Sequence, residues 1–191
     1  MRKQKLDMMS ILQENEAIIE GHFELPNGLH IQNYVDTDVL FQYPGLTTKI
    51  AQALADLFDK QIDVVLAPTA QNAIIAQEVA RVKGARALSA YFSNGKMRLK
   101  GHVKIEPGQK VLIVDNVSMT GRTSRQAASL ITMMNASAVG IAVIVDRSDS
   151  GAVDNIPLRS LLNYPLQTYY AGDCPMCKEG LPLKKQDGDE L

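Results

Sequence analysis

The chain of 191 residues has few cysteines and no long uninterrupted apolar segment. Only Cys174 and Cys177 occur, and such sparse cysteine use favours reduced thiols in a cytoplasmic protein. Because no apolar run is long enough for a signal peptide or a membrane span, no membrane partner is expected. The net charge of −1, from 20 basic and 21 acidic residues, does not favour a surface that binds nucleic acid.

Strand and helix patterns alternate through the middle of the chain. Four short apolar runs predict buried strands, at residues 64–67, 87–92, 110–115 and 138–145. Amphipathic helices are predicted from Pro44 onward, at 70–83 and at 122–134, and Gly84 is expected to end the second of them. This alternation is typical of an α/β fold with a doubly wound, mostly parallel sheet.

The N-terminal residues are predicted to form a small hood beside this sheet. Residues 6–20 have apolar side chains near helical spacing, and 21–28 form a strand that enters a Pro-Asn-Gly turn. A second extended run follows at 29–39. The length of the chain suits one domain. We predict a hood at 1–43, an α/β core at 44–150 and a C-terminal extension at 151–191.

The segment from Val111 to Thr123 is the most informative part of the chain. Four apolar residues lead to Asp115 and Asn116, and a Thr-Gly-Arg-Thr turn then begins a helix. Backbone N–H groups at the start of a helix favour an anion, and the two polar side chains can hold sugar hydroxyls beside it. The segment therefore predicts a sugar-phosphate site. The Asp146-Arg147 pair, after the last core strand, falls at the same edge of the sheet.

Four patterns, in this order, resemble the type I phosphoribosyltransferases, and most closely their orotate phosphoribosyltransferase branch. The hood motif Gly-His-Phe-x-Leu-x-x-Gly-x-His spans 21–30, and the segment 111–123 resembles the family's phosphoribosyl-diphosphate (PRPP) signature. The Asp-Arg pair at 146–147 and the cysteine-containing tail at 174–182 complete the set. The resemblance covers nearly the whole chain.

This resemblance implies transfer of 5-phosphoribosyl from PRPP to orotate, which gives orotidine 5′-monophosphate and diphosphate. It also implies Mg²⁺ bound with PRPP and a homodimer. The implied catalytic residues are Asp115, Asn116, Lys100 and His102. The implied PRPP-binding residues are Thr120, Gly121, Arg122, Thr123, Thr69, Gln71, Asn72, Lys96 and Arg98. The base would be bound by Phe23, His30, Tyr34 and Arg147, and Asp115 would be a weak ligand of the Mg²⁺ that PRPP shares.

Three positions depart from the family pattern. Asn116 replaces the usual second acid, and an amide brings no negative charge to a cationic transition state, so we expect catalysis weakened by ~10–100-fold. Asn72 stands in the diphosphate loop, where a glycine is usual, although asparagine tolerates left-handed backbone angles. Pro26 occupies a position where many orotate enzymes carry a basic residue.

Other interpretations of the same residues stay open. The chain is compatible with a purine or other nucleobase phosphoribosyltransferase, or with a non-catalytic PRPP-binding regulator. The basic run from Lys96 to His102 also fits a solvated β-ribbon, and Arg147 could simply pair with Asp146 or Asp149. The cysteine pair at 174 and 177 could supply two zinc ligands, but no histidine has the matching spacing, which favours a structural or incidental pair.

Overall fold

A six-stranded sheet forms the centre of the computed structural model, which describes residues 6–25, 27–148, 150–165 and 167–185. Its strand order is β4-β3-β7-β8-β10-β9, and the first five strands pair in parallel while β9 runs antiparallel to β10. The strands are β3 (Val64–Ala67), β4 (Arg86–Ser89), β7 (Lys110–Ser118), β8 (Ser137–Asp146), β9 (Ala152–Val153) and β10 (Ile156–Asn163). This arrangement confirms the predicted doubly wound, mostly parallel α/β sheet.

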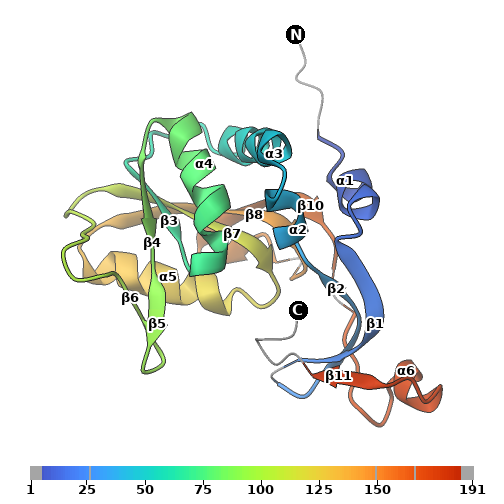
Figure 1. The fold of residues 1–191 in the computed structure, drawn as a ribbon. Helices are drawn as coiled ribbons and strands as arrows, with labels where there is room; N and C mark the ends of the chain where they lie inside the picture. Colours follow the sequence, from blue (N-terminus) through green and yellow to red (C-terminus); the bar gives the residue numbers. More distant parts are fainter. Residues whose placement is uncertain (1–5, 26, 149, 166, 186–191) are drawn as a thin grey trace.

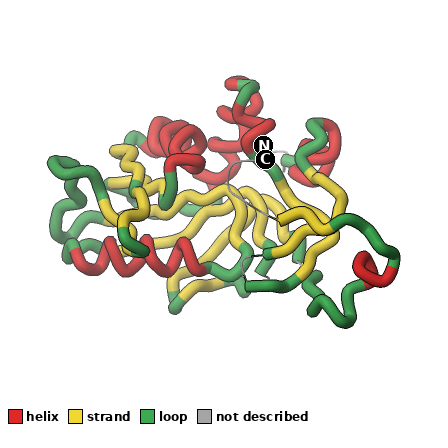
Figure 2. Tube along the Cα trace, turned by 60° about the horizontal axis from the view of Figure 1, so that its bottom comes forward, coloured by secondary structure: helices red, strands yellow, loops and turns green. Residues whose placement is uncertain are grey.

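Helices cover both faces of the sheet (Figure 2). The helices α3 (Pro44–Asp56) and α4 (Ala73–Lys83) lie on one face, and α5 (Arg122–Met133) lies on the other (Figure 1). Successive strand residues point to opposite faces, so Leu112 packs in the apolar cluster of α3 and α4 while Val111 and Ile113 pack in the cluster of α5. Burial on both faces explains why the core strands are continuous apolar runs.

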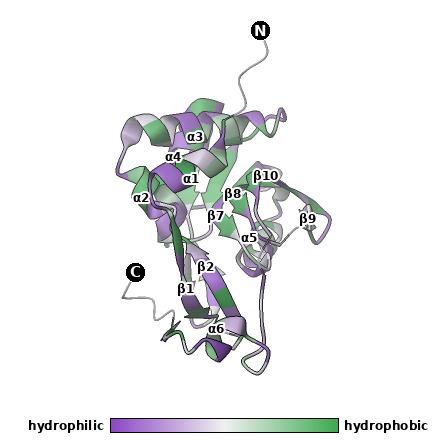
Figure 3. Ribbon diagram, turned by 90° about the vertical axis from the view of Figure 1, so that its right-hand side faces the viewer, coloured by the Kyte–Doolittle hydropathy of each residue, from purple (hydrophilic) through white to green (hydrophobic). Residues whose placement is uncertain are grey.

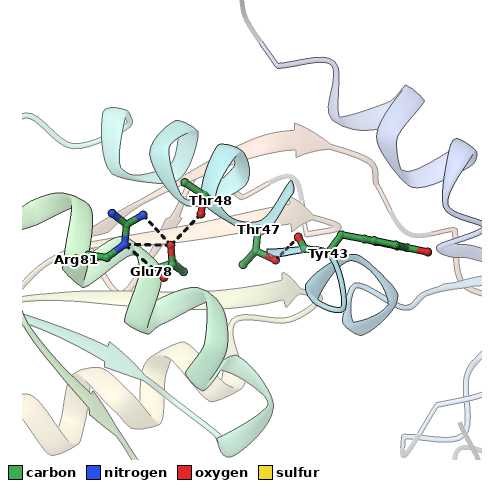
Figure 4. A network of polar contacts seen from close by, with 5 residues as sticks. All are labelled: Tyr43, Thr47, Thr48, Glu78 and Arg81. Atoms are coloured by element: carbon green, nitrogen blue, oxygen red, sulfur yellow. Dashed lines mark hydrogen bonds and ion pairs between the residues drawn. The ribbon is translucent and has the colours of Figure 1, made fainter. Parts of the chain in front are cut away.

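Polar contacts join α3 and α4 at the surface (Figure 4). Glu78 on α4 accepts hydrogen bonds from Thr48 Oγ1 on α3, at 3.1 Å, and from Arg81, at 2.8 Å. The hydroxyl of Thr47 donates to the carbonyl of Tyr43 at 3.1 Å and so ties the first turn of α3 to the chain before it. Because exposed ion pairs contribute little, the apolar cluster beneath them supplies most of the stabilisation.

A second, smaller sheet projects from the core and forms the hood (Figure 3). It consists of β1 (Ile18–Glu24), β2 (His30–Val35) and β11 (Leu183–Lys185), with β2 antiparallel and β11 parallel to β1. The short helix α6 (Pro175–Lys178) precedes β11. The hood therefore contains C-terminal residues as well as N-terminal ones.

The helix predicted at 6–20 is wrong in its second half. Helix α1 (Met8–Glu14) begins at the side-chain cap of Asp7 and ends before Glu16, whose φ of 53° reverses the chain. The β-branched pair Ile18 and Ile19 then begins β1. Helix α1 packs against the main core, as does the short helix α2 (Asp38–Phe41).

Two other predicted boundaries also differ. The strand predicted at 87–92 ends at Ser89, and β5 (Tyr91–Ser93) instead forms a separate hairpin with β6 (Lys96–Arg98). Asn94 and Gly95 both have positive φ in the tight turn between these strands, which suits an Asn-Gly pair. At the other end of the core, β9 and β10 extend the main sheet beyond residue 150, into the range predicted as a C-terminal extension.

Substitution of Gly140 tests the packing between β8 and Phe58, which follows α3. A Cβ at this position would lie 2.1 Å from the ring of Phe58, which is 3 % exposed and cannot move away easily. We expect Gly140→Ala to lower the free energy of unfolding by about 1–3 kcal/mol, measured by urea denaturation. Gly45→Ala is the matched control, because nothing lies within 4 Å of its Cβ on the exposed face of α3. It should raise stability by about 0.5–1 kcal/mol, and equal effects of both variants would contradict the packing.

Candidate active site

The connection from β7 to α5 builds an anion-binding turn at the edge of the sheet. Strand β7 continues to Ser118, three residues beyond its predicted end, so Asp115 and Asn116 lie inside the strand. Gly121 then takes a left-handed φ of 68° at the N-cap of α5, where a Cβ would lie 2.8 Å from Val153. Since glycine offers no capping side chain, the first N–H groups of α5 remain available to an anion.

A cavity of about 570 Å³ opens over this turn. It is lined from β7 and the turn by Asp115, Val117, Ser118, Met119, Thr120, Gly121, Arg122, Thr123 and Ser124, and from other segments by Leu25, Asn27, Leu29, Arg147, Ser148 and Thr168. All four predicted phosphate-binding residues of the turn thus meet Asp115 and Arg147 at one cavity. The hood supplies an apolar wall through Leu25 and Leu29.

A smaller cavity of about 210 Å³ adjoins the first and shares Asp115, Thr123 and Arg147 with it. Its lining adds the predicted residues Tyr34, Thr69, Gln71, Asn72 and Asn116, together with Asp36 and Asp38. The two cavities together form a continuous candidate site along the carboxyl edge of β3, β7 and β8.

The Asp115 carboxyl is the most perturbed group of the site. Its Oδ1 accepts hydrogen bonds from Asn72 Nδ2 at 2.9 Å and from the backbone N–H of Asn116 at 2.8 Å. Burial raises the pKa of Asp115 to about 6, although both hydrogen bonds favour the ionised form and so oppose this rise. Burial is the larger effect.

Asn72 connects the diphosphate loop to this carboxyl. Its Oδ1 accepts from Thr69 Oγ1 at 2.7 Å and from Thr69 N–H at 3.2 Å, so one side chain joins the start of the 3₁₀ helix η1 (Ala70–Asn72) to Asp115. The backbone of Asn72 is right-handed, with φ of −84°. The left-handed conformation that asparagine tolerates is therefore not used here, and the side chain of Asn72, which a glycine would lack, holds the loop.

Asn116 contacts an acidic side chain that the sequence patterns did not predict as part of the site. Its Nδ2 donates to Asp38 Oδ1 at 3.3 Å, and its buried Oδ1 has no hydrogen-bond partner among the described residues. Burial, followed by repulsion from Asp36, raises the pKa of Asp38. The sequence feature that could have indicated these acids is the Asp-Thr-Asp run at 36–38. It follows β2 directly, at a strand end that faces the core.

Arg147 is held between the hood and the core. Its NH1 and NH2 donate to the carbonyl and side-chain oxygens of Asn33, at 3.0 and 2.6 Å, and its Nε donates to the carbonyl of Tyr164 at 3.4 Å. The guanidinium also lies 5.0 Å from the ring centroid of Tyr164. No described carboxylate pairs with Arg147. Asp146 instead accepts from Ser148, so the Asp146 alternative is not supported, and Asp149 lies outside the described residues.

Some predicted site residues do not line either cavity. The four members of the basic run, Lys96, Arg98, Lys100 and His102, lie on or after the β5–β6 hairpin, away from both cavities. Phe23 is buried in the apolar cluster of the hood. The predicted base ligand His30 is also buried, and its ring contacts His22 and Cys177 rather than the cavity. Pro26 lies outside the described residues.

The fold and site define an α/β domain with an anion-binding turn at a strand–turn–helix connection, and comparison with known proteins shows the family. A model of the phosphoribosyl transferase domain family matches residues 36–170. The chain is 35% identical to the orotate phosphoribosyltransferase of Caldanaerobacter subterraneus subsp. tengcongensis, over all of both chains. It is 37% identical to that of Thermotoga maritima, over 92% of this chain and 94% of the relative. The chain therefore belongs to the phosphoribosyl transferase domain family, as the resemblance implied.

Solved structures agree with this fold. Orotate phosphoribosyltransferase from Aeropyrum pernix superposes with a TM-score of 0.66 and 20% identity, over 82% of this chain and 93% of that one. Adenine phosphoribosyltransferase from Thermoanaerobacter pseudethanolicus superposes with a TM-score of 0.63 and 17% identity, over 80% and 99% of the chains. Because both specificities share this fold, the fold alone does not select the base.

The raised pKa of Asp115 predicts a pH dependence of stability. Between the ordinary value of 3.8 and about 6, the folded chain holds a proton at Asp115 that the unfolded chain releases. Stability from this group is therefore present at low pH and lost as pH rises through about 6. We expect the unfolding free energy of the wild type, relative to Asp115→Asn, to fall from pH 4 to pH 7 by on the order of 1.4 kcal/mol per unit of pKa shift. A difference that stays constant over this range would contradict the burial of an ionisable carboxyl.

Proposed function

We propose that this chain transfers 5-phosphoribosyl from PRPP to orotate, giving orotidine 5′-monophosphate and diphosphate, a step of pyrimidine nucleotide synthesis. The observation that carries the proposal is the larger cavity, which places the open N-terminus of α5, the Asp115 carboxyl and the Arg147 guanidinium around one space. The orotate phosphoribosyltransferase names of relatives that match the whole chain support it.

The 5′-phosphate of PRPP would lie in the turn before α5. Thr120 and Thr123 can donate from their hydroxyls, and the N–H groups from Gly121 onward complete the cradle. Asp115, on the preceding strand, would accept from the ribose hydroxyls. These fixed contacts hold the sugar while its anomeric carbon gains positive charge in the oxocarbenium-like transition state, which lowers the entropic part of the barrier. The ionised Asp115 also stabilises that charge.

Arg147 is the proposed contact for the carboxylate of orotate. A guanidinium has five N–H donors, and hydrogen bonds to Asn33 and Tyr164 use three of them. The remaining donors suit a carboxylate, and the absence of a described acidic partner leaves the positive charge for a ligand. Burial lowers the pKa of Arg147, which reflects the cost of a cation that awaits an anionic partner. A purine lacks a carboxylate and would leave this charge unpaired.

The smaller cavity suits the Mg²⁺ that we propose to accompany PRPP. Asp36, Asp38, Asp115 and the unpartnered Oδ1 of Asn116 offer oxygen ligands, which magnesium prefers. Mg²⁺ would neutralise the departing diphosphate. Thr69 and Gln71 at the edge of this cavity would donate to the diphosphate oxygens.

We propose a homodimer in which the basic run from Lys96 to His102 serves the neighbouring subunit. These cations lie away from the cavities of their own chain, and the exposed aromatic residues Tyr91 and Phe92 are on the same hairpin. Clustered cations suit a leaving group that carries several negative charges.

The proposed location of the protein is the cytoplasm. No described helix has the length and apolarity that a bilayer crossing requires.

Diphosphate release with a panel of bases tests the proposed reaction and the role of Arg147. With PRPP, Mg²⁺ and orotate we expect turnover, and Arg147→Ala should raise the KM for orotate by about 10–100-fold, since charge-assisted hydrogen bonds are worth about 1.5–3 kcal/mol. The Kd for PRPP, measured by calorimetry, should change little. Arg159→Ala is the matched control, because the exposed Arg159 also lies over an aromatic ring, that of Phe58 at 5.1 Å, but lines neither cavity.

The same assay separates the two rival functions. A purine phosphoribosyltransferase would release diphosphate with adenine or another purine and would be insensitive to Arg147→Ala. A non-catalytic regulator would bind PRPP in calorimetry and release no diphosphate with any base. Either result would overturn the proposed use of orotate.

Asn116→Asp tests whether a missing carboxylate limits turnover. We expect turnover with Mg²⁺ to rise by ~10–100-fold, because the second negative charge favours the cationic transition state. Without Mg²⁺ the same variant should unfold more easily, since the new carboxylate would lie about 3.3 Å from Asp38 Oδ1. The double variant Asn116→Asp, Asp38→Asn should recover this stability. Unchanged turnover in the single variant would show that the amide is not limiting.

A further inference from the structure

Four side chains with metal-binding chemistry meet in the hood, away from the candidate active site. His22 comes from β1, His30 from the start of β2, and Cys174 and Cys177 from the two ends of the first turn of α6. Their ligand atoms all lie within 4.8 Å of one another, and only Cys177 is exposed. No other group of three or more His, Cys, Asp or Glu residues with this proximity occurs in the described part of the chain.

The two histidines meet because of strand register. Glu24 pairs with His30 across the hairpin, and side chains of directly paired residues point to the same face. His22 is two residues before Glu24 on the same strand, so it also points to that face and becomes the diagonal neighbour of His30. Sequence spacing alone did not reveal this pair, because the eight-residue separation is produced by a hairpin turn and not by a local motif.

Three of the distances between ligand atoms match a tetrahedral centre. Cys174 Sγ and Cys177 Sγ lie 3.5 and 3.6 Å from His22 Nε2, and Cys177 Sγ lies 3.4 Å from His30 Nδ1. An ion with bonds of ~2.1 Å to nitrogen and ~2.3 Å to sulfur at tetrahedral angles separates such atoms by roughly 3.6 Å. The two ring nitrogens are 2.8 Å apart, so a bound ion with Zn–N bonds of ~2.1 Å would spread them by roughly 0.6 Å.

The outer contacts of His22 also fit a metal ligand. Its Nδ1 lies 2.9 Å from the carbonyl oxygen of Leu181, which can only accept, so Nδ1 carries the proton. In the neutral ring this leaves the lone pair on Nε2, which faces both sulfurs and His30. Metal-bound histidines commonly donate their other N–H to a carbonyl in this way, which fixes both the tautomer and the ring orientation.

The backbone around the cysteines is arranged to hold both sulfurs. Cys174 is the N-cap of α6 and Pro175 occupies its first position, where proline suits a helix start. The N–H of Lys178 donates to the carbonyl of Cys174, and that of Gly180 donates to the carbonyl of Cys177. A Cys-x-x-Cys turn closed in this manner presents two thiolates to one ion.

We propose that His22, His30, Cys174 and Cys177 bind a structural Zn²⁺ ion. Two thiolates and two imidazoles form a closed four-ligand set, which zinc favours and which magnesium, an oxygen-seeking ion, does not. As each Zn–S bond forms, the thiol releases its proton to solvent. With four protein ligands there is no open position for substrate, so the role is structural.

The ion would fasten the C-terminal segment to the hood. Beside the four ligands, β11 pairs with β1, and Tyr169 exchanges backbone hydrogen bonds with His30 at 2.8 and 3.0 Å. The larger cavity is lined by three residues that lie close in the sequence to these contacts, namely Leu25, Leu29 and Thr168. Zinc would thus stabilise one wall of that cavity. This inference does not rest on the proposed reaction.

Metal content tests the proposal without substrate. We expect about one zinc per chain by plasma mass spectrometry of untagged protein, and almost none in Cys177→Ser or His22→Asn. His102→Asn is the matched control, because it removes the remaining histidine of the chain and should retain full zinc. Protein reconstituted with Co²⁺ should show tetrahedral d–d bands and a thiolate charge-transfer band, and removal of the metal by a chelator should lower the thermal midpoint.

Three results would overturn the proposal. One is protein without stoichiometric metal in which both thiols react freely with a thiol reagent. Another is a Cys174–Cys177 disulfide found by mass spectrometry in protein purified under reducing conditions. The third is zinc content that is equal in the wild type, Cys177→Ser and His22→Asn. Because the cobalt spectrum is recorded on the wild-type chain, the proposal stays testable even if a ligand variant does not fold.

Discussion

Burial of the Asp115 carboxyl, inside β7 and next to the end of β3, is the constraint on which the site depends. The parallel strands bring the Asn72 side chain, the Asn116 amide and Arg147 to one edge of the sheet. Because a buried carboxyl without partners is strongly destabilising, both hydrogen bonds to Asp115 are needed to keep it in place. The bond from Asn72 also holds the loop after β3 against β7. Asp115 lines both cavities, so its fixed position in β7 sets where the two cavities lie relative to each other.

Charge is divided between the two cavities. Asp115 and Arg147 line both cavities. The open N-terminus of α5 favours anions in the larger cavity, whereas Asp36 and Asp38 give the smaller cavity a negative lining. Asn116 donates to Asp38 and adds no further negative charge beside it, which offers a physical reason for an amide at this position. PRPP accompanied by a divalent cation has both kinds of charge and would satisfy both sets of side chains.

Local patterns predicted the core and the turn before α5, because apolar runs and a glycine turn act over a few residues. The strand at 64–67 and the αL end of α4 at Gly84 appear as predicted. Such local patterns could not predict contacts between residues that are far apart in the sequence. Three such contacts depend on how the hood packs. Asn116 donates to Asp38, and Arg147 donates to Asn33. His30 contacts Cys177 instead of lining the cavity. The end of α1 was missed because apolar spacing continues past Glu14 while the backbone turns at Glu16.

A crystal structure with PRPP and Mg²⁺ tests the central claim most directly. The account predicts density for the 5′-phosphate against the N–H groups of residues 121–123, with the ribose hydroxyls beside Asp115. An empty larger cavity at saturating PRPP, or a phosphate bound elsewhere, would contradict it.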